Sequence, residues 1–242
     1  MRKSIFATLA IILGVALCWA APPVDKIPSL LTTPAEARIT SVIVGGSPPS
    51  PPAGITRLGF AHEEETGFPY SMTVSIPAST NLLVLFDCGY GTSDNRMTAA
   101  DLGGTQNFTM DYTAKNDDGY CSVGHLFNPN LSGTTINITK AGMEYNSVYY
   151  AVYYSGVSSV GDTDGGSNSI TLTTTSGNIV ILGGSSADND PAWTNATVID
   201  SHDTSGGIYT DIAQMTADGV SETISHDGNS SYAGIAGIVL VP

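Results

Sequence analysis

The stretch NLLVLFDCGYG, residues 81–91, decides the fold class that we expect, because residues 82–86 are continuously apolar. A short apolar run of this kind is typical of a central strand that is covered on both faces. In Ser71–Ile76, just upstream, every second residue is apolar, as in a strand with one face in water. The two patterns together predict a β domain with both interior and surface strands.

Short strand candidates continue to the end of the chain, separated by turn residues such as Asp117-Asp118-Gly119 and Ser176-Gly177. Helical periodicity is weak, and no internal repeat is evident. We expect strands at 55–60, 71–76, 81–86, 107–112, 120–126, 134–139, 147–155, 169–175, 178–182, 196–200, 207–216, 220–225 and 233–241. So many short strands predict an all-β, two-sheet β-sandwich of the jelly-roll kind over residues 55–242.

The first residues are typical of a secretory signal. Two basic residues precede an apolar run at 5–16, which is too short to span a membrane with confidence. We expect residues 1–20 to be a signal peptide cut after Ala20 or Ala21. A lipid-modified Cys18 is the alternative.

A processing and assembly region is expected next. Residues 21–38 form a leader, or a propeptide if the chain is cut after Arg38. Residues 39–46 form a strand candidate that is apolar on both faces, and residues 47–54 form a proline-rich, semi-rigid linker that holds it away from the domain; an edge strand of its own domain is the alternative. Its apolar residues are Ile39, Val42, Ile43 and Val44.

Acidic residues dominate the charge: 22 Asp and Glu face 8 Lys and Arg, for a net charge of −14. Such a chain repels phosphate backbones and anionic lipid, so we expect no nucleic-acid partner. No segment after the signal is long and apolar enough to be transmembrane. The mature protein is expected outside the cytoplasm, secreted or at the cell surface.

Cys88 and Cys121 remain once the signal is removed, and in an oxidising compartment they predict one disulfide, with two free buried thiols as the alternative. Sequons for N-glycosylation occur at Asn107, Asn130, Asn137, Asn195 and Asn229.

Asp162 and Asp164 stand in a Gly-rich segment whose oxygen ligands suit calcium, although the full calcium-loop signature is missing and a solvated turn is the alternative. No other cofactor is expected. The acids of Glu63-Glu64-Glu65 are most simply a charged loop.

Tyr149 and Tyr153 share one face of a strand and could stack on sugar rings; burial in the core is the alternative. Ser201-His202-Asp203 and Ser225-His226-Asp227 contain the residue types of a catalytic triad. Adjacent residues on a strand point in different directions, so we assign no catalytic residue and expect a non-enzymatic protein.

Two resemblances follow from these segments. The order NLLVLFDCGYG, HLFNPNLSGTTINITK, YYAVYYSGVSSVGD, SITLTTTSGNIVILGG and YAGIAGIVLVP resembles a secreted jelly-roll module of environmental microbial proteins over residues 70–242, which implies a β-sandwich and secretion. The layout of residues 39–54 resembles fibre and pilus subunits that assemble by donor-strand exchange. This implies an extracellular structural subunit that polymerises with itself through residues 39–46. A carbohydrate-binding or adhesive surface module is the alternative.

Overall fold

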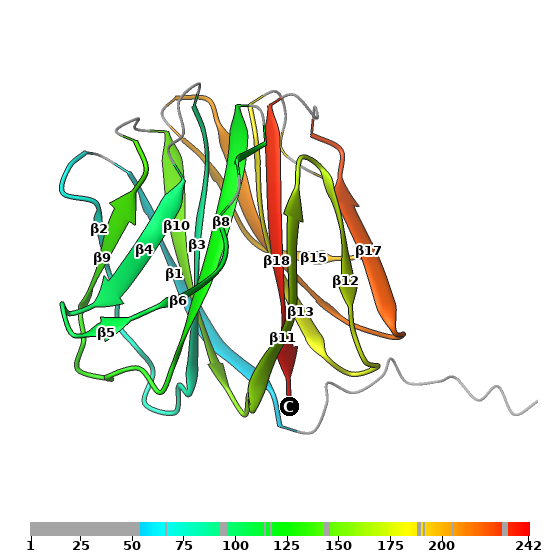
Figure 1. Ribbon diagram of the computed structural model, residues 1–242, viewed down its shortest axis with the longest axis horizontal. Coiled ribbons are helices and arrows are strands. Elements are labelled where there is room, and N and C mark those ends of the chain that lie inside the picture. Colours follow the sequence, from blue (N-terminus) through cyan, green and yellow to red (C-terminus); the bar gives the residue numbers. More distant parts are fainter. Residues whose placement is uncertain are drawn as a thin grey trace, which may run out of the picture. The chain divides into compact units, whose positions relative to one another are not determined.

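The computed structural model describes residues 54–242 except 66, 92–95, 114, 117, 143–145, 188, 189, 191, 205 and 229–231. The expected signal peptide (1–20), leader (21–38) and donor strand (39–46) lie outside the described residues, as does all of the 47–54 linker but Gly54. The described chain is all-β with antiparallel pairing throughout (Figure 1). It holds no helix long and apolar enough to cross a membrane.

Residues 56–155 build two sheets. The first inner sheet has the order β1-β10-β3-β8-β6, with β7 also paired to β8, and the first outer sheet has the order β2-β9-β4-β5. The bounds are β1 Thr56–Glu64, β2 Ser71–Thr73, β3 Leu82–Tyr90, β4 Met97–Leu102, β5 Gln106–Asn107, β6 Thr109–Tyr112, β7 Lys115–Asn116, β8 Gly119–Phe127, β9 Thr135–Lys140 and β10 Ser147–Ser155.

Residues 159–241 build two more sheets. The second inner sheet has the order β11-β18-β13-β16-β15, and the second outer sheet has the order β12-β17-β14. The bounds are β11 Ser159–Gly166, β12 Ser169–Thr173, β13 Ile179–Ser186, β14 Trp193–Thr194, β15 Thr197–Asp203, β16 Tyr209–Thr216, β17 Ser221–His226 and β18 Ala233–Val241.

The four sheets stack as layers: outer, inner, inner, outer (Figure 1). Three apolar clusters fill the spaces between them. One joins the first outer and first inner sheets through residues such as Ile136 and Leu85. Another joins the two inner sheets, for example Phe86 and Ile181, and a third joins the second inner and second outer sheets, for example Leu182 and Leu172.

The two halves of the chain share one topology. In each half, the inner sheet starts with the first, last and third strands, in the order β1-β10-β3 in one half and β11-β18-β13 in the other. Each outer sheet starts with the second strand of its half, β2 or β12. The fifth residues of β3 and β13, Phe86 and Gly183, are therefore equivalent, and these positions touch: a Cβ on Gly183 would lie 2.5 Å from Phe86 Cδ1. The sequence showed no repeat, but the strand order reveals one.

The inner strands explain the apolar runs. β3 and β10 each have eight buried residues followed by one partly buried residue, because an apolar layer lies on both faces. The expected central strand is thus confirmed. Outer strands alternate instead, as in β12, where Ile170 and Leu172 are buried and their neighbours are exposed.

Three expectations need correction. The sheets number four, not two, because each half forms its own pair; the jelly-roll connectivity stays a prediction. Met97–Leu102, where we expected no strand, is strand β4. Ser159–Gly166, where we expected no strand and a possible solvated turn around Asp162 and Asp164, is strand β11. This strand lies at the edge of its sheet, where less apolar surface is buried. It therefore contains glycines and acids, and its sequence lacks the apolar pattern that predicts a strand.

Candidate functional site

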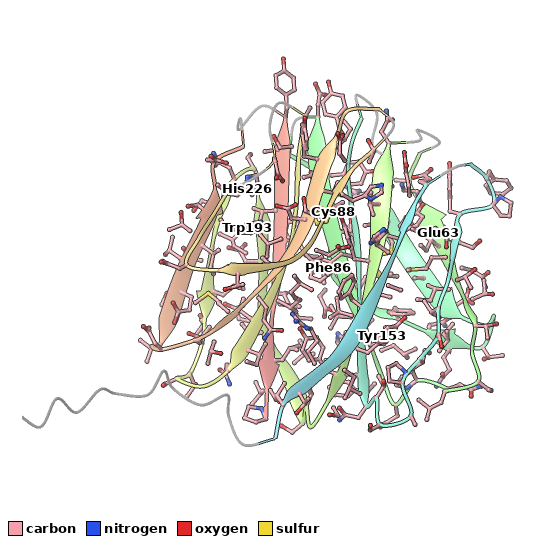
Figure 2. All side chains as sticks on the ribbon, turned by 180° about the vertical axis from the view of Figure 1, so that it is seen from behind. Glu63, Phe86, Cys88, Tyr153, Trp193 and His226 are labelled. Carbon is pink, nitrogen blue, oxygen red and sulfur yellow. A yellow bond between two sulfur atoms is a disulfide. The ribbon has the colours of Figure 1, made fainter. Side chains whose placement is uncertain are left out.

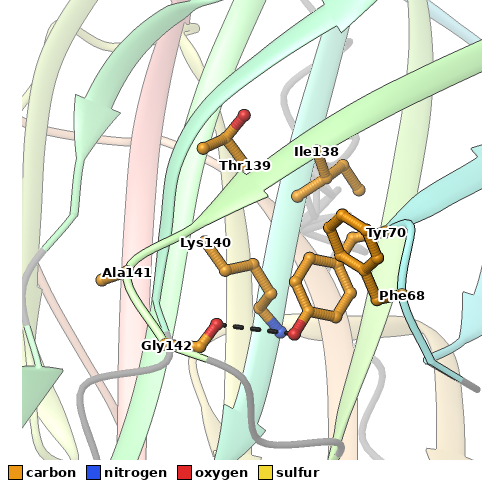
Figure 3. Close-up of a pocket in the computed structure, with 7 residues that line it drawn as sticks. All are labelled: Phe68, Tyr70, Ile138, Thr139, Lys140, Ala141 and Gly142. Carbon is orange, nitrogen blue, oxygen red and sulfur yellow. Dashed lines mark hydrogen bonds between the residues drawn. The ribbon is translucent and has the colours of Figure 1, made fainter.

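A pocket of about 220 Å³ opens where β9 ends, beside the segment that leads into β2 (Figure 3). Tyr70 is buried in its wall and Phe68 is 77% exposed at its rim, with their rings edge to face at 5.7 Å. The Tyr70 hydroxyl donates to the Gly142 carbonyl at 3.5 Å. The lining residues are Phe68, Tyr70, Ile138, Thr139, Lys140, Ala141 and Gly142.

A buried lysine stands at the inner wall of this pocket. The Lys140 side chain has no exposed surface, and its Nζ donates to Glu65 Oε2 at 2.5 Å and to Ser147 Oγ at 2.8 Å. Ser147 Oγ also donates to Glu65 Oε2, at 2.7 Å. These bonds hold the ammonium and the carboxyl group in one orientation between the first outer and first inner sheets.

A second buried carboxyl group faces the same amine. Asp87 Oδ1 is 3.4 Å from Lys140 Nζ, and neither oxygen of Asp87 has a hydrogen bond within the described chain. Burial raises the pKa of Asp87 to about 6, with Lys140 acting in the opposite direction. Two acids therefore share one cation in a region of low dielectric, which favours keeping one of the acids protonated.

Aromatic rings enclose the lysine on several sides. Its Nζ lies 5.4, 5.6 and 5.3 Å from the ring centroids of Tyr70, Tyr120 and Tyr149. Ring faces attract a cation, so these rings stabilise the charge of the lysine. Burial raises the pKa of Tyr149, and the charges of Asp87 and Glu65 raise it further.

The sequence carried signals for this cluster that our interpretation missed. Asp87 interrupts an otherwise apolar central strand, and a buried acid needs a partner. Lys140 is one of few basic residues available as that partner. Glu65 was read as part of a charged loop, but it is only 6% exposed. The preceding acids have other roles: Glu63 accepts a hydrogen bond from the Thr73 amide at 2.8 Å.

The tyrosines proposed for glycan stacking are core residues. Tyr149 and Tyr153 are 1% and 2% exposed, packed between the first outer and first inner sheets. A ring without an exposed face cannot stack on a sugar, so that role is withdrawn, and the alternative of core burial is confirmed.

The disulfide between Cys88 and Cys121 is present, joining directly paired residues of β3 and β8. It is a weak indication of an oxidising compartment outside the cytoplasm. The sequon residues Asn107, Asn130, Asn137 and Asn195 are exposed, and Asn229 lies outside the described residues. Their glycosylation stays a prediction.

Asp162 and Asp164 lie on β11, where both carboxylates accept backbone amides of β12. Asp162 Oδ2 accepts the Thr173 amide at 2.8 Å, and Asp164 Oδ2 accepts the Thr171 amide at 3.1 Å. No group of three or more His, Cys, Asp or Glu side chains in the described chain could hold a metal ion. The two acids join the edges of β11 and β12. Calcium binding at Asp162 and Asp164 stays a prediction.

The Ser225-His226-Asp227 side chains contact separate partners. Ser225 Oγ lies 3.4 Å from Thr194 Oγ1, His226 Nδ1 accepts the Gly228 amide, and Asp227 accepts the Ala192 amide. Burial lowers the pKa of His226, which packs against Trp193 at the second outer sheet (Figure 2).

The Ser201-His202-Asp203 segment lies on β15, beside β1. His62 Nδ1 on β1 lies 2.5 Å from Asp200 Oδ2 on β15, and His202 Nε2 lies 3.6 Å from Glu64 Oε2. The histidine rings are 5.0 Å apart. These pairs join the adjoining edges of the two inner sheets.

A second pocket, of about 350 Å³, carries exposed aromatic surface. Its lining includes Tyr90 and Tyr232, with ring centroids 6.0 Å apart, together with Gly206, Gly207 and Ile208. Tyr232 is 37% exposed. The sequence interpretation missed this pair because its members are distant along the chain.

Comparison with known proteins adds no family: no family model, no curated protein and no solved structure matches the chain.

Proposed function

We propose that this protein is an extracellular structural subunit that assembles into filaments. Residues 39–46 of one copy would add as a strand to a neighbouring copy. The observation that carries this proposal is the separation between the start of the described domain and the pocket beside β9.

The chain enters the domain at Gly54, next to Gly156 and Pro242. β1 then runs for nine residues, about 30 Å, before the chain reaches Phe68 and Tyr70 at the pocket. The segment that precedes Gly54 and the pocket that would receive it therefore belong to opposite ends of β1. A contact between different surfaces on successive copies extends into a filament unless the rotation between copies closes it into a ring.

The pocket suits the end of an added strand. β2 pairs with β9 from Thr135 to Asn137, and the Ile138 amide also donates to the Tyr70 carbonyl at 2.9 Å. The edge of β9 therefore extends past its partner only over its last two residues, Thr139 and Lys140. Main-chain bonds at such an edge provide affinity, and side-chain pockets provide specificity. An apolar side chain such as Val42 or Val44 matches the mixed aromatic and aliphatic lining.

Electron microscopy of the secreted full chain tests the proposal. Filaments are expected from the natural sequence. Deletion of residues 39–46 is expected to leave a folded monomer, and so is Thr139→Trp, which fills the pocket from an exposed position. Thr223→Trp, at an exposed threonine on β17, is the control that should still polymerise. Filaments from the deleted chain would refute strand addition.

A glycan-binding module is the second candidate, supported by the pocket of Tyr90 and Tyr232 instead of the buried pair. Aromatic faces beside glycine-rich backbone are a common way to hold sugar rings. A glycan array should then give a signal that Tyr232→Ala abolishes and Phe60→Ala, at an exposed aromatic outside the pocket, preserves. No signal from the natural protein would count against this function.

A further inference from the structure

Lys140 lines the pocket of the proposed assembly, but together with Asp87 and Glu65 it also forms a buried charged set that the assembly does not explain. An amine and a carboxyl group, both without exposed surface, lie 3.4 Å apart, and a second carboxyl group bonds to the same amine. The three residues come from β9, from β3 and from the position after β1, so folding alone brings them together.

In most buried ion pairs the carboxylate oxygens accept hydrogen bonds from neighbouring groups, but three oxygens of this set do not. Glu65 Oε1 and both Asp87 oxygens lack hydrogen bonds within the described chain. Replacing a charged pair by a neutral bond removes the cost of keeping such groups away from water. Holding two reacting groups close together in a fixed geometry also removes much of the entropy cost that a reaction between separate molecules has to overcome.

We propose that Lys140 Nζ and Asp87 Cγ join as an amide in the folded protein, with Glu65 transferring the protons. This modification is independent of the proposed filament function, because all three groups belong to one domain.

The step balances without any other reactant. Glu65 takes a proton from the Lys140 ammonium, and the free amine attacks Cγ of a protonated Asp87 to form the C–N bond. Glu65 then gives its proton to the departing hydroxyl and takes another from the nitrogen. The C–O bond breaks, one water molecule leaves, and nothing is oxidised or reduced. The raised pKa of Asp87 supports the protonated acid that this step needs.

The bond would fasten the first outer sheet to the first inner sheet. Its neighbour on β3, Cys88, faces the opposite side and is already linked to Cys121 within the inner sheet. The second half lacks the pair: Gly184 is equivalent to Asp87, and Trp193 occupies the space where its side chain would extend. The second half therefore serves as an internal reference without the bond.

Mass spectrometry of the full chain, secreted from a bacterial host that does not glycosylate sequons, tests the proposal. The reduced, denatured protein should be one water molecule lighter than its mature sequence. Reduction is essential, because the disulfide joins the same tryptic fragments, 58–96 and 116–140. With the amide present, trypsin should fail to cut after Lys140, and a branched peptide should contain both Asp87 and Lys140.

A natural chain of full mass, with linear peptides at both positions, would overturn the inference. Glu65→Gln keeps the size of the side chain and a hydrogen-bond acceptor but removes the proton carrier, and should give the full mass. Asp101→Asn, at an acid on β4 of the same outer sheet, should keep the water loss. If Glu65→Gln still carries the bond, the role of Glu65 is wrong.

Discussion

Gly183→Ala tests the packing of the two inner sheets. A Cβ at this position would lie 2.5 Å from Phe86 Cδ1 and 2.8 Å from the Sγ atoms of Cys88 and Cys121. Carbon atoms in contact prefer 3.5–4.0 Å, so the new methyl group overlaps all three neighbours. Overpacking a core costs about 1–3 kcal/mol. Two of the neighbours are fixed by the disulfide, and we therefore expect a loss of about 3 kcal/mol of unfolding free energy.

Urea unfolding monitored by Trp193 fluorescence measures this loss, since the other tryptophan, Trp19, falls in the expected signal peptide. Gly219→Ala is the matched control, because no atom lies within 4 Å of its Cβ position, and it should change stability by less than about 0.5 kcal/mol. Adding Phe86→Leu to Gly183→Ala relieves one overlap of three. The double-mutant cycle should therefore show a favourable coupling of about 0.5 kcal/mol or more. Equal stability of the two alanine variants would refute the close approach.

The remaining predictions concern stability. Replacing Cys88 and Cys121 with alanine should lower the unfolding free energy by about 3–4 kcal/mol, measured in urea against the oxidised natural protein; a variant as stable as the oxidised natural protein would contradict this. Tyr150→Phe removes a buried hydroxyl that is hydrogen-bonded to Thr210 Oγ1 at 2.7 Å and to the Thr210 carbonyl at 2.9 Å. The unfolding free energy should fall by about 1 kcal/mol in the same assay. A change near zero would contradict this, because it would mean that these bonds contribute little. Burial raises the pKa of Asp211 from 3.8 to about 6, so the folded state binds more protons between these values and stability falls as pH rises through about 6. Asp211→Asn should make that decline shallower, and an unchanged or steeper decline would contradict the sign.

The strands of the interior could be predicted from the sequence because their pattern is strong. Residues 82–86 are apolar without interruption, and a run this short, followed by glycines, is typical of a strand covered on both faces. The disulfide could be predicted because two cysteines remain outside the expected signal peptide.

The number of layers could not be predicted in the same way. An apolar run shows that both faces of a strand are covered but not which sheet covers each face. Asp87 shows the same limit: its position demands a partner, yet Lys140 becomes that partner only through pairing between distant strands. Tyr149 and Tyr153 share one face of their strand whether that face binds sugar or lies in the core. The face is buried because the first outer sheet covers it, which the sequence pattern of this strand does not show.

The course of β1 between Gly54 and the pocket has a mechanical consequence. Tension applied between Gly54, before β1, and Ser147, at the start of β10 by the other end of β1, pulls the two strands along their axes in opposite directions, while the hydrogen bonds between them lie across that direction. The ladder from Thr56 to Glu64 is then loaded in shear, so its bonds share the force and do not open one after another. The domain therefore resists stretching along this axis better than peeling from its edge.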